Sequence, residues 1–280
     1  MAAPKTILLV GDDPSVRQLL QTAASSASPQ IETVRNNAAC LERVKAEAFD
    51  LVVTDIQTAG MDDLELLRRL RWLRPEIKVI VLAPQSTTED VIELLREHAF
   101  GYFSQPLDAS SFAHLVTLAL QVNNWQDGIE VVSARPEWIA LRVRCRRMTA
   151  DRLMQFMREL RMDLPVEERE NIGIAFREML MNALEHGAGF DPHKTVDICT
   201  VRTPRMILYQ IRDPGEGFSF DNLPHAAISN PEDDPIAHLA YRSEHGLRAG
   251  GFGMMIVRDL VDELYYNEKG NEALLIKHLD

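Results

Sequence analysis

The chain has 280 residues, of which 46% are hydrophobic and 26% charged, and it carries a formal net charge of −12. This length fits one large domain or two ordinary ones, and the composition excludes disordered and fibrous proteins. No apolar run approaches the roughly 18 to 20 residues that cross a bilayer, and the N-terminal sequence turns acidic after one short apolar stretch, unlike a secretory signal. We therefore expect a cytoplasmic protein without membrane contact.

Both halves of the chain are acidic, at −5 for residues 1–125 and −7 for residues 126–280. A DNA-reading domain needs cations that displace counterions from phosphates, so this charge predicts a protein partner and no DNA. The three cysteines lie far apart, which is typical of neither a disulfide framework nor a metal site. We expect Cys40, Cys145 and Cys199 to be buried thiols.

Short apolar runs alternate with helical patterns over the first 125 residues. The predicted strands are Thr6–Val10, Ile31–Val34, Leu51–Thr54, Lys78–Leu82 and Gly101–Phe103. The predicted helices are Pro14–Ala24, Ala38–Ala46, Asp62–Leu73, Thr87–Glu97 and Ala109–Gln121. Five such repeats predict an α/β domain of the flavodoxin-like (βα)5 type, with its ligand site at the carboxyl ends of parallel strands.

Polar residues follow three of these strands, namely Asp12, Asp55 and Gln105. The segments VGDDPSVRQLL, LVVTDIQTAGMDDLELLRRLR and GYFSQP resemble the receiver domain of response regulators, over about residues 4–122. The resemblance implies that Asp55 accepts a phosphoryl group from the phosphohistidine of an upstream histidine kinase. It also implies that Asp12 and Asp55 hold Mg²⁺ and that Tyr102 occupies an aromatic switch position.

Three positions depart from the receiver pattern. Gly11 stands where one of two acidic residues is usual, Ala83 stands at the Thr/Ser position, and Gln105 stands at the Lys position. Losing a carboxylate weakens a Mg²⁺ site, and a glutamine offers no charge-assisted contact to a phosphoryl oxygen. Two interpretations stay open: slow phosphorylation of Asp55 with a damaged read-out, or a domain used only for docking or dimerisation.

The second half begins with a predicted pair of strands, Ile129–Ser133 and Trp138–Cys145, so we place the domain boundary near residue 125. The predicted domains are therefore 1–125 and 126–280. Thr149 is expected to cap a helix over Ala150–Leu160.

A longer helix is predicted from Pro165 to Glu185. Its apolar stripe consists of Ile172, Ala175, Phe176, Met179, Leu180 and Ala183. At about 100° per residue, a polar row falls beside that stripe, formed by Asn171, Glu178, Asn182 and Glu185. The helix therefore presents polar groups at the edge of a core.

Two glycine-rich segments follow this helix, at Asp213–Phe218 and Gly250–Met255. Together with FREMLMNALEHG, and in this order and spacing, they resemble the three nucleotide-binding boxes of the Bergerat-fold (GHKL) ATPases, which include histidine kinases and gyrase. The closest resemblance is to the anti-sigma-factor serine kinases of bacterial partner-switching systems, over about residues 129–280. It implies an α/β-sandwich domain that binds ATP and Mg²⁺.

The resemblance also implies a role for each residue. Asn182 coordinates Mg²⁺ together with phosphate oxygens, and Asp213 accepts a hydrogen bond from the adenine amine. Gly215 and Gly217 let the backbone approach the base. Gly251 and Gly253 line the phosphates before a helix that starts near Met254, and residues 219–249 form a lid.

Glu178 lies one turn before Asn182, where it is placed to take a proton from an attacking hydroxyl or water. The alternative is a surface carboxylate paired with an arginine. For His186, beside Gly187 at the helix end, we favour a dipole-capping role over catalysis.

A histidine kinase also needs a phosphoacceptor histidine on a long helical hairpin, which this sequence does not offer. The leading hypothesis is therefore an ATP-dependent protein-serine/threonine kinase of the anti-sigma type, with the receiver as its input. Its expected partner is an anti-sigma-factor antagonist (STAS-type) or a sigma factor-like protein, and we expect a homodimer. The alternatives are a non-catalytic, ATP-binding docking switch and a histidine-kinase-like ATPase.

Overall fold

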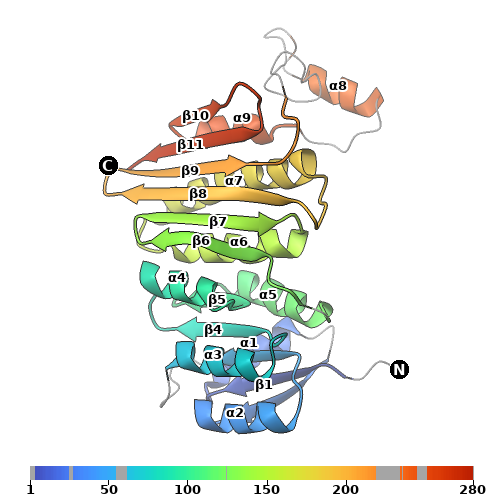
Figure 1. Ribbon diagram of the computed structural model, residues 1–280, viewed down its shortest axis with the longest axis vertical. Coiled ribbons are helices and arrows are strands. Elements are labelled where there is room, and N and C mark those ends of the chain that lie inside the picture. Colours follow the sequence, from blue (N-terminus) through green and yellow to red (C-terminus); the bar gives the residue numbers. More distant parts are fainter. Residues whose placement is uncertain are drawn as a thin grey trace. The chain divides into compact units, whose positions relative to one another are not determined.

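The structure is a computed structural model that describes residues 4–24, 28–54, 62–123, 125–218, 234, 236–244 and 251–279 (Figure 1). The chain divides into two compact units. The first unit contains residues 1–127 and 151–163, and the second contains residues 128–150 and 164–280. Within the described ranges, the helices are too short or too polar to cross a membrane.

The first unit is built on a parallel five-stranded sheet in the order β2-β1-β3-β4-β5. Its strands are β1 Thr6–Val10, β2 Gln30–Val34, β3 Leu51–Thr54, β4 Val79–Ala83 and β5 Gly101–Ser104. Its helices are α1 Pro14–Ala23, α2 Asn37–Ala46, α3 Asp63–Leu73, α4 Thr88–Arg96 and α5 Ala109–Gln121. This strand order confirms the predicted flavodoxin-like fold.

Each of these five helices begins at a side chain that accepts a hydrogen bond from the backbone of its first turn. Such N-caps satisfy donors that a helix start leaves free, each contributing about 1 kcal/mol. The capping residues are Asp13, Asn36, Asp62, Thr87 and Asp108. Between the helices, the central strands are fully buried, as their continuous apolar runs predict.

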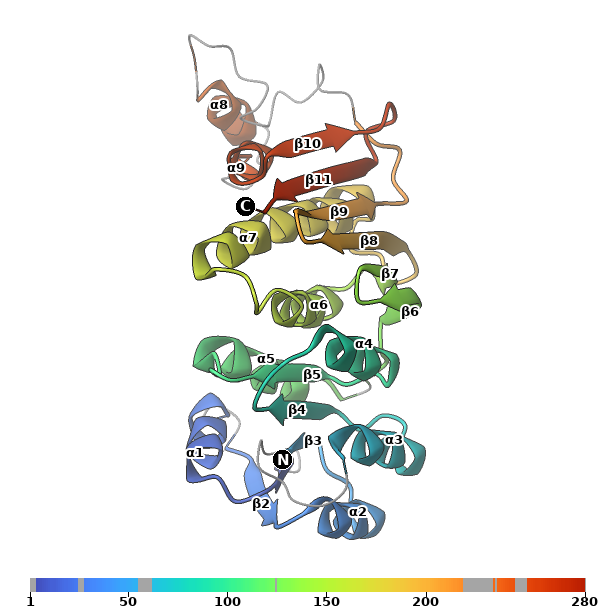
Figure 2. The ribbon, with the colours of Figure 1, turned by 90° about the vertical axis from the view of Figure 1, so that its left-hand side faces the viewer.

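The second unit holds an antiparallel six-stranded sheet in the order β10-β11-β9-β8-β7-β6. Its strands are β6 Ile129–Arg135, β7 Trp138–Arg144, β8 Thr195–Thr203, β9 Met206–Arg212, β10 Glu263–Tyr266 and β11 Glu272–His278. Helix α7, Val166–Asn182, packs on β9 and β11, and α9, Gly253–Leu260, packs on α7 and β10 (Figures 1 and 2). The predicted α/β sandwich is thereby confirmed.

The apolar stripe predicted on α7 forms the core beneath this sheet. All six of its residues are buried, and the Phe176 ring lies 4.8 Å from the ring of Tyr209 on β9. The end of α7 widens into a π-helical turn, Ala183–Gly187. The polar row beside the stripe is therefore held on a helix whose position is fixed by packing.

Two predictions about side chains are wrong. Helix α6 spans Arg147–Glu159, so Thr149 lies inside the helix, fully buried, and does not cap its start. Cys40 and Cys145 are buried thiols, but Cys199 is half-buried because it points away from the core face of β8. Burial raises the pKa of Cys40 to about 12 and that of Cys145 to about 11, which keeps both thiols protonated at neutral pH.

Candidate functional site

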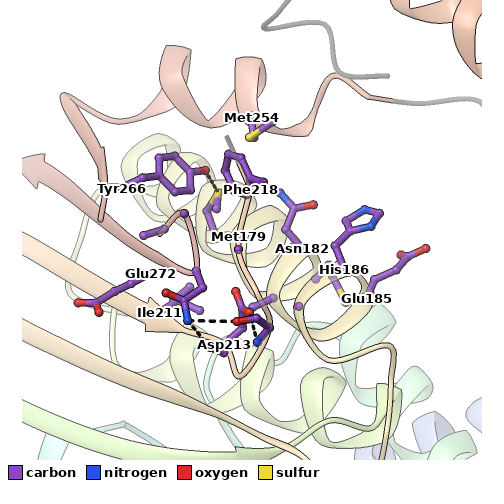
Figure 3. Close-up of a pocket in the computed structure, with 18 of the residues that line it drawn as sticks. Met179, Asn182, Glu185, His186, Ile211, Asp213, Phe218, Met254, Tyr266 and Glu272 are labelled. Carbon is purple, nitrogen blue, oxygen red and sulfur yellow. Dashed lines mark hydrogen bonds between the residues drawn. The ribbon is translucent and has the colours of Figure 1, made fainter. Parts of the chain in front are cut away.

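A cavity of about 940 Å³ opens in the second unit, between α7, α9 and the loops that follow β9 and β10 (Figure 3). Its volume lies at the upper end of the range for small-molecule and cofactor sites. Of the residues predicted to bind or act on a ligand in this half, all seven line it: Glu178, Asn182, Asp213, Gly215, Gly217, Gly251 and Gly253. The structure thus places residues from three distant segments around one space.

Helix α7 supplies one wall of the cavity. Glu178 and Asn182 lie one turn apart on it, and both are half-buried. The Glu178 Oε1 atom is 3.6 Å from Nη1 of the exposed Arg177, which is too long for a hydrogen bond. Glu185 and His186 on the π-helical turn also line the cavity, in addition to the helix-end position expected for His186 (Figure 3).

Asp213, directly after β9, lies at the base of the cavity (Figure 3). Its Oδ1 accepts a hydrogen bond of 2.8 Å from the Gly215 N–H, and its own N–H donates to the carbonyl of Asn271. Burial raises the pKa of the Asp213 carboxyl above its ordinary value, against the opposing effects of the Gly215 N–H and the Lys269 charge. The carboxylate is therefore a fixed and poorly solvated hydrogen-bond acceptor.

Gly187 lets this carboxylate sit against the end of α7. A Cβ atom added to Gly187 would lie 2.2 Å from Oδ1 of Asp213, a distance that real contacts do not reach. At Gly217 the backbone has a φ of +81°, and a Cβ there would lie 1.8 Å from the carbonyl oxygen of Lys269. Both positions require glycine for steric reasons, although Gly187 was not among the residues singled out from the sequence as ligand-binding.

The turn between β10 and β11 holds the Asp213 loop from the other side. The Nδ2 atom of the buried Asn271 donates to the carbonyl of Asp213 at 3.1 Å, and Lys269 Nζ donates to the carbonyl of Gly215 at 2.9 Å. Sequence reasoning missed both residues. The available signal was the NEKGN turn, in which Asn267 and Asn271 bond each other's side chains across four residues.

An aromatic pair forms the apolar part of the lining. The rings of Phe218 and Tyr266 meet edge to face at 5.2 Å, and the Tyr266 hydroxyl lies 3.5 Å from Sδ of Met179 (Figure 3). Burial raises the pKa of Tyr266, so its hydroxyl stays neutral. The cavity therefore combines one apolar wall with the half-buried Asp213 carboxylate, a suitable combination for a planar base that carries an amine.

Helix α9 points its start at the opposite end of the cavity. It begins at Gly253, and its N-cap residue Phe252 offers no side-chain hydrogen bond to the first turn. A Cβ built on Gly253 would lie 2.8 Å from Oε2 of Glu178, so that carboxylate lies beside the helix start. Free N–H groups and the positive end of a helix dipole form an anion site, suitable for phosphate.

The predicted lid over residues 219–249 lies mostly outside the described residues. Within it, the structure describes residue 234 and the residues that include helix α8, Ala237–Glu244, a helix that the sequence pattern did not predict.

In the first unit, the described residues Gly11 and Asp12 follow β1 at the carboxyl edge of the sheet. Asp12 is exposed after β1, whereas Asp13 is occupied as the cap of α1. Gly11 is buried with a φ of +116°, and its N–H donates to the carbonyl of Val34. Asp55 lies outside the described residues, and among those described no group of three or more metal-ligating side chains is present.

The positions that would read a phosphoryl group offer no charge. Ala83 is the last residue of β4, and Gln105 follows β5 and is joined to Pro106 by a cis peptide bond. Tyr102 is buried, with its hydroxyl donating to the carbonyl of Gln85 at 3.1 Å.

Comparison with known families finds a separate match in each half of the chain. The family described as "Response regulator receiver domain" matches residues 7–117, and the family described as "Histidine kinase-like ATPase domain" matches residues 143–277. The second match contains all seven predicted residues of the cavity.

Individual relatives share only part of the chain. It is 33% identical over 102 residues to the transcriptional regulatory protein ZraR of Klebsiella oxytoca, covering 36% of this chain and 23% of that protein. It is 30% identical over 114 residues to the DNA-binding transcriptional regulator NtrC of Escherichia coli K12, covering 41% of this chain and 24% of that protein. The chain thus spans about a quarter of the length of these curated relatives.

Among solved structures, a CheY-like response regulator receiver domain protein from Methanospirillum hungatei JF-1 is 24% identical. The match covers 42% of this chain and 95% of that chain, with a TM-score of 0.38. The beryllofluoride-activated DrrB receiver domain is 23% identical, covering 43% of this chain and 100% of that chain, also with a TM-score of 0.38.

Proposed function

Because the chain joins a response regulator receiver domain to a histidine kinase-like ATPase domain, we propose that it is a signalling kinase. In this proposal the second domain binds ATP with Mg²⁺ and phosphorylates serine or threonine on a separate protein. The receiver domain modulates that activity. The observation that carries the proposal is the position of the Glu178 carboxylate beside the start of α9 and one turn before Asn182.

The lining of the cavity fits ATP. Asp213 presents an acceptor for the adenine amine next to the aromatic pair, and the Asn182 amide oxygen suits Mg²⁺, a small, hard cation that prefers oxygen ligands. The start of α9 offers N–H donors for phosphate oxygens. These three kinds of group match the base, the metal and the phosphates in turn.

ATP, when bound, supplies the phosphoryl group that is transferred. Glu178 would hold the proton that the attacking hydroxyl loses, at the carboxylate oxygen facing the start of α9. General-base catalysis of this kind contributes about 10²- to 10⁴-fold to a rate. Next to this carboxylate, the Asn182 amide oxygen would hold Mg²⁺, and the N–H groups at the start of α9 would donate to the phosphate oxygens.

The proposed substrate is a protein hydroxyl and not a histidine of this chain. Between α5 and β6 the described residues, 122–123 and 125–128, form no helix that would carry a phosphoacceptor. The acidic charge of both domains favours a protein partner over DNA. We propose an anti-sigma-factor antagonist domain as the phosphorylated partner, with a sigma factor-like protein as a second binding partner.

One observation favours a second candidate, an ATP-dependent docking switch without phosphoryl transfer. The guanidinium of Arg177 lies 3.6 Å from the Glu178 carboxylate, which fits the alternative role of Glu178 as a surface carboxylate paired with an arginine. In this candidate, ATP only shapes a surface for a partner.

Glu178→Gln separates the two candidates. It should lower transfer of the γ-phosphoryl group to an antagonist protein by about 10²- to 10⁴-fold, while the dissociation constant for a fluorescent ATP analogue changes less than about threefold. Transfer is measured with γ-labelled ATP, and the matched control is Glu170→Gln, which alters an exposed residue on the same helix away from the cavity. Nucleotide binding without labelling of any antagonist-type protein encoded beside this chain would contradict the kinase proposal and support the docking switch.

A further inference from the structure

Helix α6 belongs partly to each of the two units. It lies inside residues 143–277, the segment that matches the ATPase family, yet from Asp151 onward it packs as part of the first unit. The residues on either side of this stretch, Ala150 and Leu164, belong to the second unit. One helix is thus shared, through the chain itself, by the receiver and the ATPase domain.

The surface that holds α6 is the free edge of the receiver sheet. Strand β5 is an edge strand, and edge strands leave backbone carbonyls without partners in the sheet. Arg152 donates from Nε to the carbonyl of Phe100 at 2.8 Å and from Nη2 to the carbonyl of Ala99 at 2.7 Å. Gln155 Nε2 donates to the carbonyl of Tyr102 at 3.0 Å. Side chains of α6 therefore donate hydrogen bonds to backbone carbonyls along the edge where another strand would otherwise pair.

Arg152 makes this contact specific. Its side chain is 1% exposed, and its guanidinium lies about 5 Å from the rings of Phe100 and Trp125, at 5.1 and 5.0 Å. Its Nη1 also forms an ion pair of 2.7 Å with Asp127. A buried charge is tolerated only when it is fully paired and hydrogen-bonded, so any shift of α6 along β5 would leave this charge unsatisfied.

The far end of α6 reaches the functional edge of the receiver. Ser104, the last residue of β5, donates a buried hydrogen bond of 2.6 Å to Oε2 of Glu159, the last residue of the helix. Carboxyl ends of parallel strands share one edge, and Gly11 and Asp12 follow β1 at that same edge. A structural change at the carboxyl edge of the receiver can therefore reach α6 directly, through the hydrogen bond between Ser104 and Glu159.

The connection from α6 to the ATP cavity is short. Hydrogen bonds continue past the end of the helix, from Arg161 N–H to Arg158 and from Met162 N–H to Glu159, and α7 starts at Val166. Helix α7 carries Glu178 and Asn182. Holding the end of α6 therefore restrains the start of the helix that supplies one wall of the cavity.

We infer that the β5 edge of the receiver is an intramolecular docking surface for α6, and that the receiver controls the nucleotide site by holding or loosening this helix. The inference rests on the proposed function in one respect: the regulated quantity is the affinity of the cavity for ATP.

The test uses the full chain with Gln155→Leu, which removes the donor to Tyr102 and keeps the side-chain volume. Arg152→Gln is the stronger second variant, and Arg69→Gln is the matched control because Arg69 is an exposed arginine of the same unit that pairs with Glu65 on its own helix. Hydrogen exchange is followed in peptides covering residues 147–163 and 166–187, and affinity is measured with fluorescent ATP. We expect faster exchange in both peptides and a dissociation constant raised roughly threefold to tenfold, with no change in the control.

The inference is overturned if hydrogen exchange over residues 147–163 stays unchanged in both variants. It is also overturned if exchange over 147–163 becomes faster while exchange over 166–187 and the affinity for fluorescent ATP stay as in the unmodified chain. If the unmodified chain binds no nucleotide, the proposed function fails. The exchange over 166–187 still decides the role of α6 in that case.

Discussion

The two domains have equally well-formed folds, but they differ in whether the residues expected at their sites are present. In the receiver, the strands other than the partly exposed β2 are largely buried and helices α1 to α5 are capped, but three positions expected to bind metal or phosphate hold Gly11, Ala83 and Gln105. In the ATPase domain, residues from α7, the β9 loop and α9 all meet at one cavity. Packing and capping thus maintain the receiver fold even though three of its site positions depart from the expected residues.

The sharpest test of the intact site is Gly187→Ala. The new Cβ would overlap the Asp213 carboxylate, so either the carboxylate or the π-helical turn must move. Displacing a positioning group by about 1 Å costs on the order of 10²-fold in rate, and we expect transfer from γ-labelled ATP to fall by about that factor. Calorimetric titration should show weaker ATP binding as well.

Gly189→Ala is the control for Gly187→Ala. Gly189 has a φ of +66° but no atom within 4 Å of an added Cβ, so the substitution introduces strain without a clash. Equal losses of ATP binding in Gly187→Ala and Gly189→Ala would show that the close approach of Gly187 to Asp213 does not matter.

The next effect in size concerns the charge of Asp213. The ionised carboxylate accepts a hydrogen bond from an amine more strongly than the protonated acid does, and burial raises its pKa above 3.8. ATP affinity should therefore fall as the pH drops, with a midpoint above 3.8. Asp213→Asn should weaken binding by about 10- to 150-fold at neutral pH and remove this pH dependence.

Asp259→Asn, at an exposed position on α9, is the matched control for the charge change. Affinity that is flat with pH in the unmodified chain down to the ordinary carboxyl range would argue against Asp213 as the acceptor.

The smallest expected effect lies in the receiver. Restoring a carboxylate with Gly11→Asp forces a residue with a side chain into a φ of +116°, which costs about 1–3 kcal/mol of unfolding free energy. Urea titration measures this loss. Asp12→Asn, which introduces no strain, is the control. A stable Gly11→Asp variant with higher Mg²⁺ affinity would show that the receiver site lacks only a side chain and that its backbone remains competent.

The sequence predicts the receiver elements to within one residue at each end, for a physical reason. Apart from β2, its strands are short runs buried on both faces, and residues such as Asp13 and Thr87 mark helix starts locally. The strands of the second sheet, such as β8 and β9, alternate between buried and partly exposed residues, and sequence reasoning predicted neither. The alternation is blurred in the sequence, because the polar Thr200 is a buried position of β8 and the apolar Leu208 is a partly exposed position of β9.

The site shows the same division between local and long-range information. Glu178 and Asn182 could be paired from helical spacing alone. Asn271 could not be found this way, because its role depends on a contact with Asp213, 58 positions away in the chain. The attachment of α6 to the receiver depends likewise on contacts between Arg152 and carbonyls more than 50 positions away.

The π-helical turn at the end of α7 has a consequence for how the cavity tolerates insertions and deletions. A regular α-helix of about 3.6 residues per turn would place Gly187 about 140° around the axis from Asn182, facing away from the cavity. The wider turn over Ala183–Gly187 takes up an extra residue and brings Gly187 back toward Asp213. Deleting a single residue from this turn would return the helix to regular phase and rotate the glycine out of the site, so the length of this segment is as constrained as its residues.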